Sequence, residues 1–182
     1  SQKNVWREFP SSIGRAAVVL IPRNPLEAEE KPFRKAAPRA RCFGMSIVPA
    51  GLLKLTGKDL AQEPLLPPDS FRETSVLAFC GLASPAGFFE TLEKLEMRLS
   101  ATLTFRDHHD YPPRSWHRIV ELWRRFRPDA VVTTEKDAVK LLGREDVPGS
   151  LPLYALRIRL SLDPAVLDLV AATLSENPPG AS

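Results

Sequence analysis

A chain of 182 residues is long enough for one domain, or for one domain with a small additional lobe. Its hydrophobic content of 43% and charged content of 26% exclude a disordered chain, and no run of eighteen apolar residues is present to span a membrane. A net charge of +3 suits anionic partners such as nucleotides, phospholipids or nucleic acid and does not select among them. Cys42 and Cys80 lie in apolar runs, which predicts buried free thiols in a reducing compartment.

The first third of the chain is predicted to contain two strands. Ala16–Ile21 is short, β-branched and apolar, as in a buried parallel strand, and Pro22 ends it. Residues 24–37 are expected to form an exposed loop or a short helix, and Cys42–Val48 a second strand. The assignment of Leu52–Leu60 stays open.

Prolines mark the connections. There are 18, about double the usual frequency, and Pro64–Ser70 is the best candidate linker. We therefore divide the chain into an N-terminal strand-containing segment over residues 1–63, a linker over 64–74 and a C-terminal β/α domain over 75–182. The start at Ser1, without a methionine, is compatible with a piece of a longer protein.

From residue 75 onward strands and helices alternate. Ser75–Leu82 is a predicted strand, and Ser84 and Pro85 are predicted as N-cap and first turn of a helix whose apolar spacing continues to Leu99. The elements that follow are a strand over Ala101–Phe105, a helix over Arg114–Phe126, a strand over Ala130–Thr133, a helix over Glu135–Leu142, a strand over Leu153–Leu160 and a last helix from Asp163 to Leu174. This order predicts an α/β fold with a mostly parallel sheet flanked by helices.

Four ionisable residues, Asp107 to Asp110, directly follow the strand that ends at Phe105. Ligands of open α/β sheets bind outside the carboxyl ends of the strands, and an Asp–His pair placed there is able to take a proton from a hydroxyl. Two other interpretations stay open, namely a polar loop with one histidine capping the next helix, and a metal site. Adjacent histidines generally point apart, which disfavours the metal site.

A second cluster, Thr133–Asp137, lies at another strand-to-helix turn. Its hydroxyls and backbone N–H groups suit a phosphate, and Lys136 would add a positive charge. The simpler interpretation makes Thr134 an N-cap with Glu135 and Asp137 in the first turn, which explains every residue type except Lys136.

Two further stretches carry weaker signals. Gly81 opens a third strand-to-helix turn and allows close backbone approach, with a tight turn without ligand as the favoured interpretation. Gly51–Asp59 superficially resembles an ATP phosphate-binding loop. It has one residue too many between its glycines and places Asp59 where a magnesium-binding hydroxyl belongs, so we reject it.

Four stretches together resemble one family. They are Arg15–Ile21 with Arg7–Pro10 upstream, Ala78–Phe89, Phe105–Tyr111 (similar to "FxDHHxY") and Thr133–Leu141 (similar to "TTEKDAVKL"). In this order and spacing they resemble the tetraacyldisaccharide 4′-kinases, which are the lipid A 4′-kinases. Ala83 departs from the pattern, because the family usually has asparagine at this position.

The resemblance implies the C-terminal part of a P-loop NTPase-like kinase, which transfers the ATP γ-phosphate to the 4′-hydroxyl of a lipid A disaccharide 1-phosphate. It implies catalytic roles for His108 and Asp107. ATP and Mg²⁺ would be bound mainly by an upstream Walker A region, so this chain alone is expected to be inactive. The residues implied near the nucleotide or the lobe interface are Thr133, Thr134, Glu135, Lys136 and Asp137.

The implied partners are the lipid substrate, ATP and the anionic surface of the bacterial inner membrane on its cytoplasmic side, without nucleic acid. One alternative is a noncatalytic module that binds a nucleotide or anionic lipid. Another is a small metal-dependent hydrolase using Asp107, His108 and His109. The arginines of the Arg114–Phe126 helix indicate either a solvated face or a contact with lipid headgroups.

Overall fold

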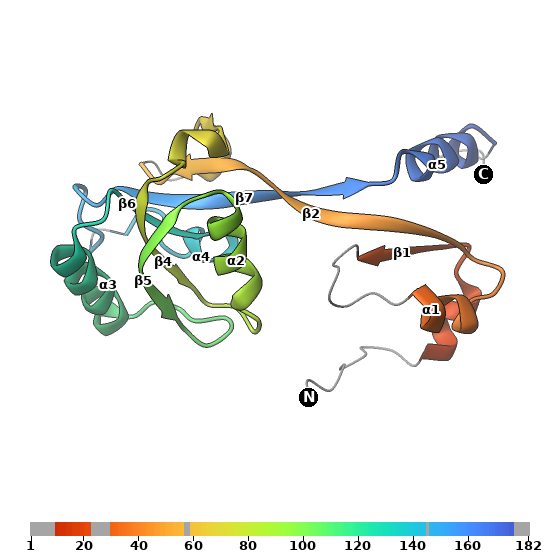
Figure 1. Cartoon of the computed structure of the whole chain (residues 1–182), viewed down its shortest axis with the longest axis horizontal. Helices are drawn as coiled ribbons and strands as arrows, with labels where there is room; N and C mark the ends of the chain where they lie inside the picture. Colours follow the sequence, from red (N-terminus) through yellow and green to blue (C-terminus); the bar gives the residue numbers. More distant parts are fainter. Residues whose placement is uncertain (1–9, 23–29, 57–58, 145, 177–182) are drawn as a thin grey trace. The chain divides into compact units, whose positions relative to one another are not determined.

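The structure is a computed structural model that describes residues 10–22, 30–56, 59–144 and 146–176 (Figure 1). The chain forms two compact units. Unit 1 comprises residues 1–48 and 160–182, and unit 2 comprises residues 49–159. The division of the sequence into residues 1–63, 64–74 and 75–182 stays a prediction.

Unit 1 is built around a parallel strand pair. Val18 lies opposite Arg41 and Pro22 opposite Met45. The expected strand is confirmed but its burial is not, because Ile21 is buried whereas Leu20, on this edge strand, is 37% exposed. The elements are η1 (Pro10–Arg15), β1 (Val18–Pro22), α1 (Glu30–Ala36), the start of β2 (Arg41–Lys54), the end of β7 (Leu153–Leu162) and α5 (Pro164–Glu176).

Unit 2 contains the parallel sheet. Its strands β4 (Ser75–Cys80), β5 (Arg98–Thr104) and β6 (Ala130–Thr134) lie in the order β7-β6-β4-β5, and every neighbouring pair is parallel. This confirms the mostly parallel α/β sheet. β5 lies on one side of β4, and β7 lies on the far side of β6. The connections after β4 and β6 therefore lead to opposite sides of the sheet, and the carboxyl ends of strands at such a point are where open α/β sheets bind ligands.

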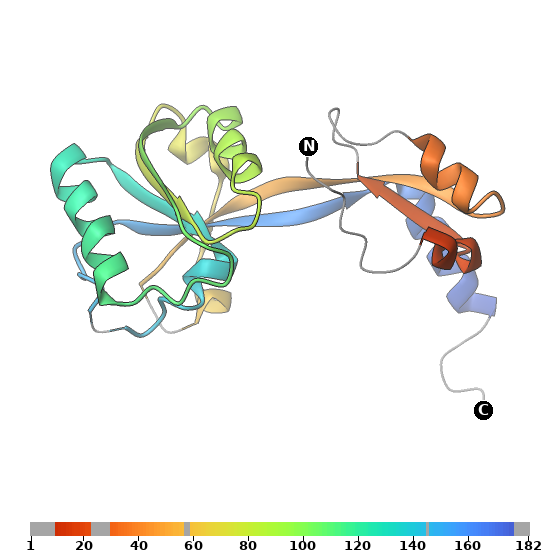
Figure 2. The ribbon, with the colours of Figure 1, turned by 90° about the horizontal axis from the view of Figure 1, so that it is seen from below.

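Strand β4 is apolar and buried from Val76 to Cys80 because helices cover both faces of the sheet. Val76, Ala78 and Cys80 pack with α2 (Ala86–Lys94), which contributes Phe88 and Leu92. Leu77 and Phe79 face the other way and pack with α3 (Pro113–Phe126), which contributes Trp116, Ile119 and Val120. Figure 2 shows the two helices on opposite sides of the strands.

Several predicted boundaries are wrong. The second strand is β2, which continues through Lys54, and α4 (Glu135–Ala138) is shorter than expected. Helix α2 ends at Lys94 and Leu99 belongs to β5, because the chain reverses at Glu96, whose φ is a left-handed 58°. Pro85 replaces Ser84 at the N-cap, without a side-chain hydrogen bond.

The segment predicted as a linker is part of unit 2. It carries β3 (Leu65–Leu66), which pairs antiparallel with β2, and η3 (Pro68–Phe71), whose Phe71 is buried in the core beside α2. In the rejected phosphate-loop stretch, Asp59 caps η2 (Leu60–Gln62) by accepting the N–H of Ala61. Leu66 and Phe71 pack with the core, which explains why the predicted linker segment lies against the sheet.

Candidate functional site

Three loops meet at the carboxyl end of the sheet in unit 2. They follow β4 at Gly81, β5 at Asp107–Tyr111 and β6 at Glu135. Because β5 and β6 flank β4, the loops after them approach each other across its end. Lys136 Nζ donates a hydrogen bond to Asp107 Oδ1 at 2.7 Å. The two polar clusters of the sequence thus come together.

The Asp107–Tyr111 loop is held in an unusual backbone conformation. His108 and Tyr111 have φ values of 58° and 52°, in the left-handed region that costs a non-glycine residue about 1–2 kcal/mol. Asp107 Oδ1 accepts the N–H of His108, and Lys140 Nζ donates to the carbonyl of His109 at 2.6 Å. Left-handed residues in such a polar loop are a recognised feature of functional sites.

The two adjacent histidines have different surroundings. The His108 side chain is 79% exposed, and its Nε2 lies 3.7 Å from Asp107 Oδ2. The His109 ring stacks on Phe105 at a centroid distance of 4.7 Å, and its Nε2 is 2.8 Å from the hydroxyl of Ser115 in the first turn of α3. Their rings point apart, as expected, so His109 is the loop histidine that contacts the next helix and His108 faces solvent.

Charge and burial set the protonation of this loop. The hydrogen bond from Lys136, with the neighbouring His108, holds the pKa of Asp107 below its usual range, so Asp107 stays a carboxylate. Burial and then the charge of Arg106 lower the pKa of His109, which favours its neutral form. The exposed His108 beside a fixed carboxylate is therefore the side chain of this loop best placed to meet a ligand.

In the Thr133–Asp137 turn, the side chains of Thr134, Glu135 and Lys136 all bind other groups of the protein. Thr134 Oγ1 accepts the N–H of Asp137, which confirms the N-cap interpretation, and Glu135 forms an ion pair with Arg157 at 2.7 Å. A phosphate does not fit this turn, because α4 has only four residues and the carboxylate of Asp137 lies at its start. Lys136, which capping left unexplained, has Asp107 as its partner.

Asp137 is fully buried beneath the site. Its Oδ2 accepts the backbone N–H of Gly81 at 2.9 Å and the hydroxyl of Thr134 at 2.7 Å. Burial, followed by the charge of Asp137, raises the pKa of Tyr111 above its usual value and that of Cys80 to about 11. Sequence reasoning missed this buried cluster, and its signal was the tyrosine that closes the Phe105–Tyr111 motif.

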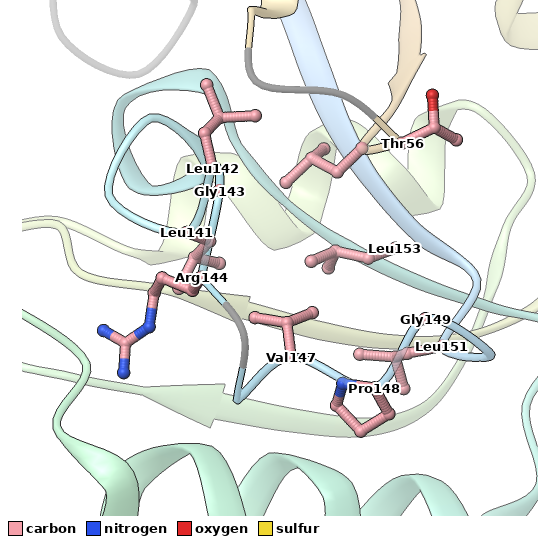
Figure 3. Close-up of a pocket in the computed structure, with 11 residues that line it drawn as sticks. Thr56, Leu141, Leu142, Gly143, Arg144, Val147, Pro148, Gly149, Leu151 and Leu153 are labelled. Carbon is pink, nitrogen blue, oxygen red and sulfur yellow. The ribbon is translucent and has the colours of Figure 1, made fainter.

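A cavity of about 490 Å³ lies beside the turn that follows α4 (Figure 3). Arg144 is its one charged lining residue within the described part of the chain, and the guanidinium is held by Asp146 at 2.6 and 2.8 Å. The cavity is lined by Leu55, Thr56, Leu141, Leu142, Gly143, Arg144, Val147, Pro148, Gly149, Leu151 and Leu153. Its largely aliphatic lining indicates a packing hollow and no reactive centre.

The outer side of α3 is strongly basic. Its exposed arginines form no ion pair within the described residues, and Phe126, at its C-terminal end, is 44% exposed beside the guanidinium of Arg125. Trp116, Ile119 and Val120, which recur at helical spacing in the sequence, are buried, whereas Phe126 at the same spacing is exposed. This basic face comprises Arg114, Arg118, Arg124, Arg125 and Arg127.

The described residues contain neither a cluster of metal ligands nor a membrane-spanning helix. Within residues 10–22, 30–56, 59–144 and 146–176, no group of three or more His, Cys, Asp and Glu side chains is placed to hold a metal ion. No helix in the same part of the chain is long and apolar enough to cross a bilayer.

The fold and the site define an open, parallel α/β protein whose polar groups meet at the carboxyl ends of its central strands. The sequence profile of the family described as "Tetraacyldisaccharide-1-P 4'-kinase" matches residues 5–175. The chain belongs to the tetraacyldisaccharide 4′-kinase family.

Relatives and a solved structure agree with this assignment. The chain is similar to tetraacyldisaccharide 4′-kinases of Desulfatibacillum aliphaticivorans (41% identity) and Pelobacter propionicus (35%), each over 90% of this chain. It spans 44% and 43% of these relatives, so less than half of their length. The crystal structure of LpxK from Aquifex aeolicus in complex with ATP matches with a TM-score of 0.50 and 20% identity, over 85% of this chain and 51% of that one, which shows a shared fold.

Proposed function

We propose that this chain is the C-terminal part of an ATP-dependent kinase that phosphorylates the 4′-hydroxyl of a lipid A disaccharide 1-phosphate. The observation that carries the proposal is the 2.7 Å ion pair between Lys136 and Asp107, which joins the two motifs of the family resemblance and leaves His108 exposed beside a fixed carboxylate. Family membership over residues 5–175 supports the same reaction.

His108 and Asp107 are the proposed catalytic groups. In phosphoryl transfer the substrate hydroxyl gives up its proton as its oxygen bonds to the γ-phosphorus, and ADP leaves, so catalysis depends on positioning and charge. Asp107 orients the imidazole of His108, whose Nε2 lies 3.7 Å from Asp107 Oδ2. His108 in turn orients the acidic base that takes the 4′-hydroxyl proton, and this base lies outside the present chain.

ATP and Mg²⁺ are proposed to bind mainly to the part of the protein that the longer relatives have in addition to the matched segment. The residues described here do not form a phosphate cradle, because the Thr134 hydroxyl donates to Asp137 and the Asp137 carboxylate also accepts the Gly81 N–H. We therefore propose that this turn supports the Asp107–Tyr111 loop next to the nucleotide and does not bind the nucleotide itself. The residues of the turn are Thr133, Thr134, Glu135, Lys136 and Asp137. We accordingly expect the 182-residue chain alone to be inactive.

The apolar surface of unit 1 supports a larger assembly. Several large apolar side chains of this unit are exposed, which is typical of surfaces that another part of a protein covers. They are Ile47, Leu160, Leu167 and Val170, with exposures of 62%, 60%, 59% and 48%. We propose that the additional portion of the kinase covers them.

The proposed membrane partner is the anionic surface on the cytoplasmic side of the bacterial inner membrane. The basic face of α3 supports it, since guanidinium groups attract anionic headgroups and the exposed ring of Phe126 suits the interface. Sedimentation with vesicles of phosphatidylglycerol and of phosphatidylcholine tests it. Replacing Arg118 and Arg125 by Gln should weaken binding to the anionic vesicles only, whereas the same change at Arg72 and Arg98 should not.

The test of the kinase uses the longest reading frame that contains this chain. Transfer of γ-phosphate from Mg-ATP to a tetraacyldisaccharide 1-phosphate is measured for the wild type, for His108→Ala and for His117→Ala, which alters an exposed histidine of α3. We expect a loss of roughly 10²–10⁴-fold in kcat for His108→Ala and none for His117→Ala. Full activity of His108→Ala would exclude the proposed role of His108.

The noncatalytic alternative makes a different prediction. A binding module would retain nucleotide or anionic lipid without turnover in the longest reading frame, so absence of transfer in every form would favour it. The metal-dependent hydrolase has less support, because the imidazole of His109 is engaged by Ser115 and Phe105 and does not join Asp107 and His108.

A further inference from the structure

Buried polar atoms gather under the functional loop without partners of their own. The hydroxyl of Tyr111, the hydroxyl of Thr133 and Oδ1 of Asp137 are all shielded from solvent, and none makes a hydrogen bond within the described part of the chain. All three residues are 0% exposed. An unsatisfied buried polar group costs about 1–3 kcal/mol, so buried groups of this kind normally have a partner close by.

Two of these atoms face the same small space. A side chain on Gly81 would begin 3.0 Å from Asp137 Oδ1, 3.3 Å from the Tyr111 hydroxyl and 3.1 Å from the carbonyl of Arg106. Gly81 is therefore required here for close approach. The space that its missing side chain leaves is lined by two acceptors, the Asp137 carboxylate and the Arg106 carbonyl, and by one hydroxyl that is able to donate.

The tyrosine ring is fixed by aromatic contacts on several sides. It packs edge-to-face against Phe79 of β4 at 5.5 Å, Phe105 at 5.1 Å and His109 at 5.0 Å between ring centroids. This packing leaves the hydroxyl beside Asp137. The φ of Tyr111 is 52°, in the left-handed region, and the residue lies where the loop turns back toward α3.

We propose that Tyr111 and Asp137 form a buried hydrogen-bonded pair that positions the Asp107–Tyr111 loop, and with it His108, over the carboxyl end of β4. The Tyr111 hydroxyl donates to Asp137 Oδ1, while Oδ2 holds the Gly81 N–H and the Thr134 hydroxyl. One carboxylate thus joins the ends of β4, β5 and β6. Both are positioning residues, and the link to catalysis rests on the proposed function.

The contacts of the 136–140 segment agree with this role. Lys136, Asp137 and Lys140 all reach the Asp107–Tyr111 loop region. Lys136 and Lys140 hold its exposed side through Asp107 and the His109 carbonyl. Asp137 holds its buried side, so the loop is fixed from above and below.

The test compares Tyr111→Phe with Tyr154→Phe in the longest reading frame. Tyr111→Phe keeps the ring and removes the hydroxyl, whereas Tyr154 lies on β7 with its ring against Phe71. We expect kcat to fall roughly 10- to 100-fold in Tyr111→Phe, with little change in KM for Mg-ATP, and to stay at the wild-type value in Tyr154→Phe. Adding Tyr111→Phe to His108→Ala should cause little further loss, because both act through one group.

Two results would overturn the proposed Tyr111–Asp137 pair. One is an unchanged kcat in Tyr111→Phe, and the other is that Tyr111→Phe lowers kcat by the same factor in His108→Ala as in the wild type. Amide hydrogen exchange is the readout that does not depend on activity. In Tyr111→Phe and in Asp137→Asn the amides of Gly81 and His109 should exchange faster, and wild-type exchange in both variants would also overturn the pair. If His108→Ala proves fully active, the proposed role of His108 fails, and faster exchange would still support the pair.

Discussion

The two polar segments that meet at the site differ in where their side chains point. In Asp107–Asp110 the side chains of Asp107 and His108 are 37% and 79% exposed, and the backbone is strained. In Thr133–Asp137 the first and last residues are fully buried. Both segments look equally reactive in the sequence. The structure leaves the first ionisable side chains of one segment exposed and buries both ends of the other.

The largest expected effect is on stability, from the buried segment. Asp137→Ala leaves the Gly81 N–H and the Thr134 hydroxyl without their acceptor, which should lower the free energy of unfolding by about 3 kcal/mol. Urea unfolding measures it, with the exposed Asp69→Ala as control, expected within about 0.5 kcal/mol of wild type. An Asp137→Ala value as small as that of the control would remove the supporting role of the buried segment.

A methyl group on Gly81 should have the next largest effect. It would press on Asp137 Oδ1 and on the Arg106 carbonyl, which lowers stability by about 1–3 kcal/mol. Gly87→Ala is the matched control. Nothing lies within 4 Å of a side chain there, and in helix α2 alanine should stabilise by up to about 1 kcal/mol. Thermal unfolding of both variants checks the opposite signs, and equal signs would contradict the close approach at Gly81.

A change in the exposed segment should affect stability in the other direction. Glycine adopts the left-handed φ of 58° at His108 without strain, so His108→Gly should leave stability unchanged or raise it by up to about 1 kcal/mol. The same variant should lose kinase activity in the longest reading frame. Unfolding and phosphate transfer measured on one preparation would separate the effect on activity from the effect on stability. A strongly destabilised His108→Gly would contradict the proposed difference between the two segments.

The smallest effect should come from the ion pair that joins the segments. Lys136 lowers the pKa of Asp107, so this contribution is present above the usual carboxylate range and is lost as the pH falls through the Asp107 titration. Lys136→Met should therefore be slightly less stable at neutral pH and should converge with wild type in acid. Unfolding at several pH values and salt concentrations tests this, because a half-exposed pair is also screened by salt.

The sequence predicted the buried strands and the core-facing helix residues of unit 2 well. The apolar run Val76–Cys80 and the helical spacing of Trp116, Ile119 and Val120 report burial directly, since each periodicity matches one face of an element. Leu99 was misplaced because it continues the helical spacing of α2 by coincidence across the turn at Glu96. A left-handed turn at a glutamate leaves no mark in the pattern.

The site was predictable only in part. Charged residues after two strands indicated where it lies, because parallel strands bring their carboxyl ends to one edge. The pattern was silent on which groups are buried. Asp137 was expected in the first helical turn, and its burial depends on Gly81, which is 56 residues away in the chain. Long-range partners of this kind are set by tertiary packing and not by local spacing.

That separation has a consequence for how the protein is made. The bond between Gly81 and Asp137 cannot form until β4, β5 and β6 have all been synthesised and paired, so the loop that carries His108 is completed late. Phe79, Phe105 and Tyr111, whose rings pack together in the folded chain, all precede Asp137 and are therefore synthesised before it. Apolar surface that is exposed before a fold is complete promotes aggregation, so we expect this end of the sheet to be the aggregation-prone part of the unfinished domain.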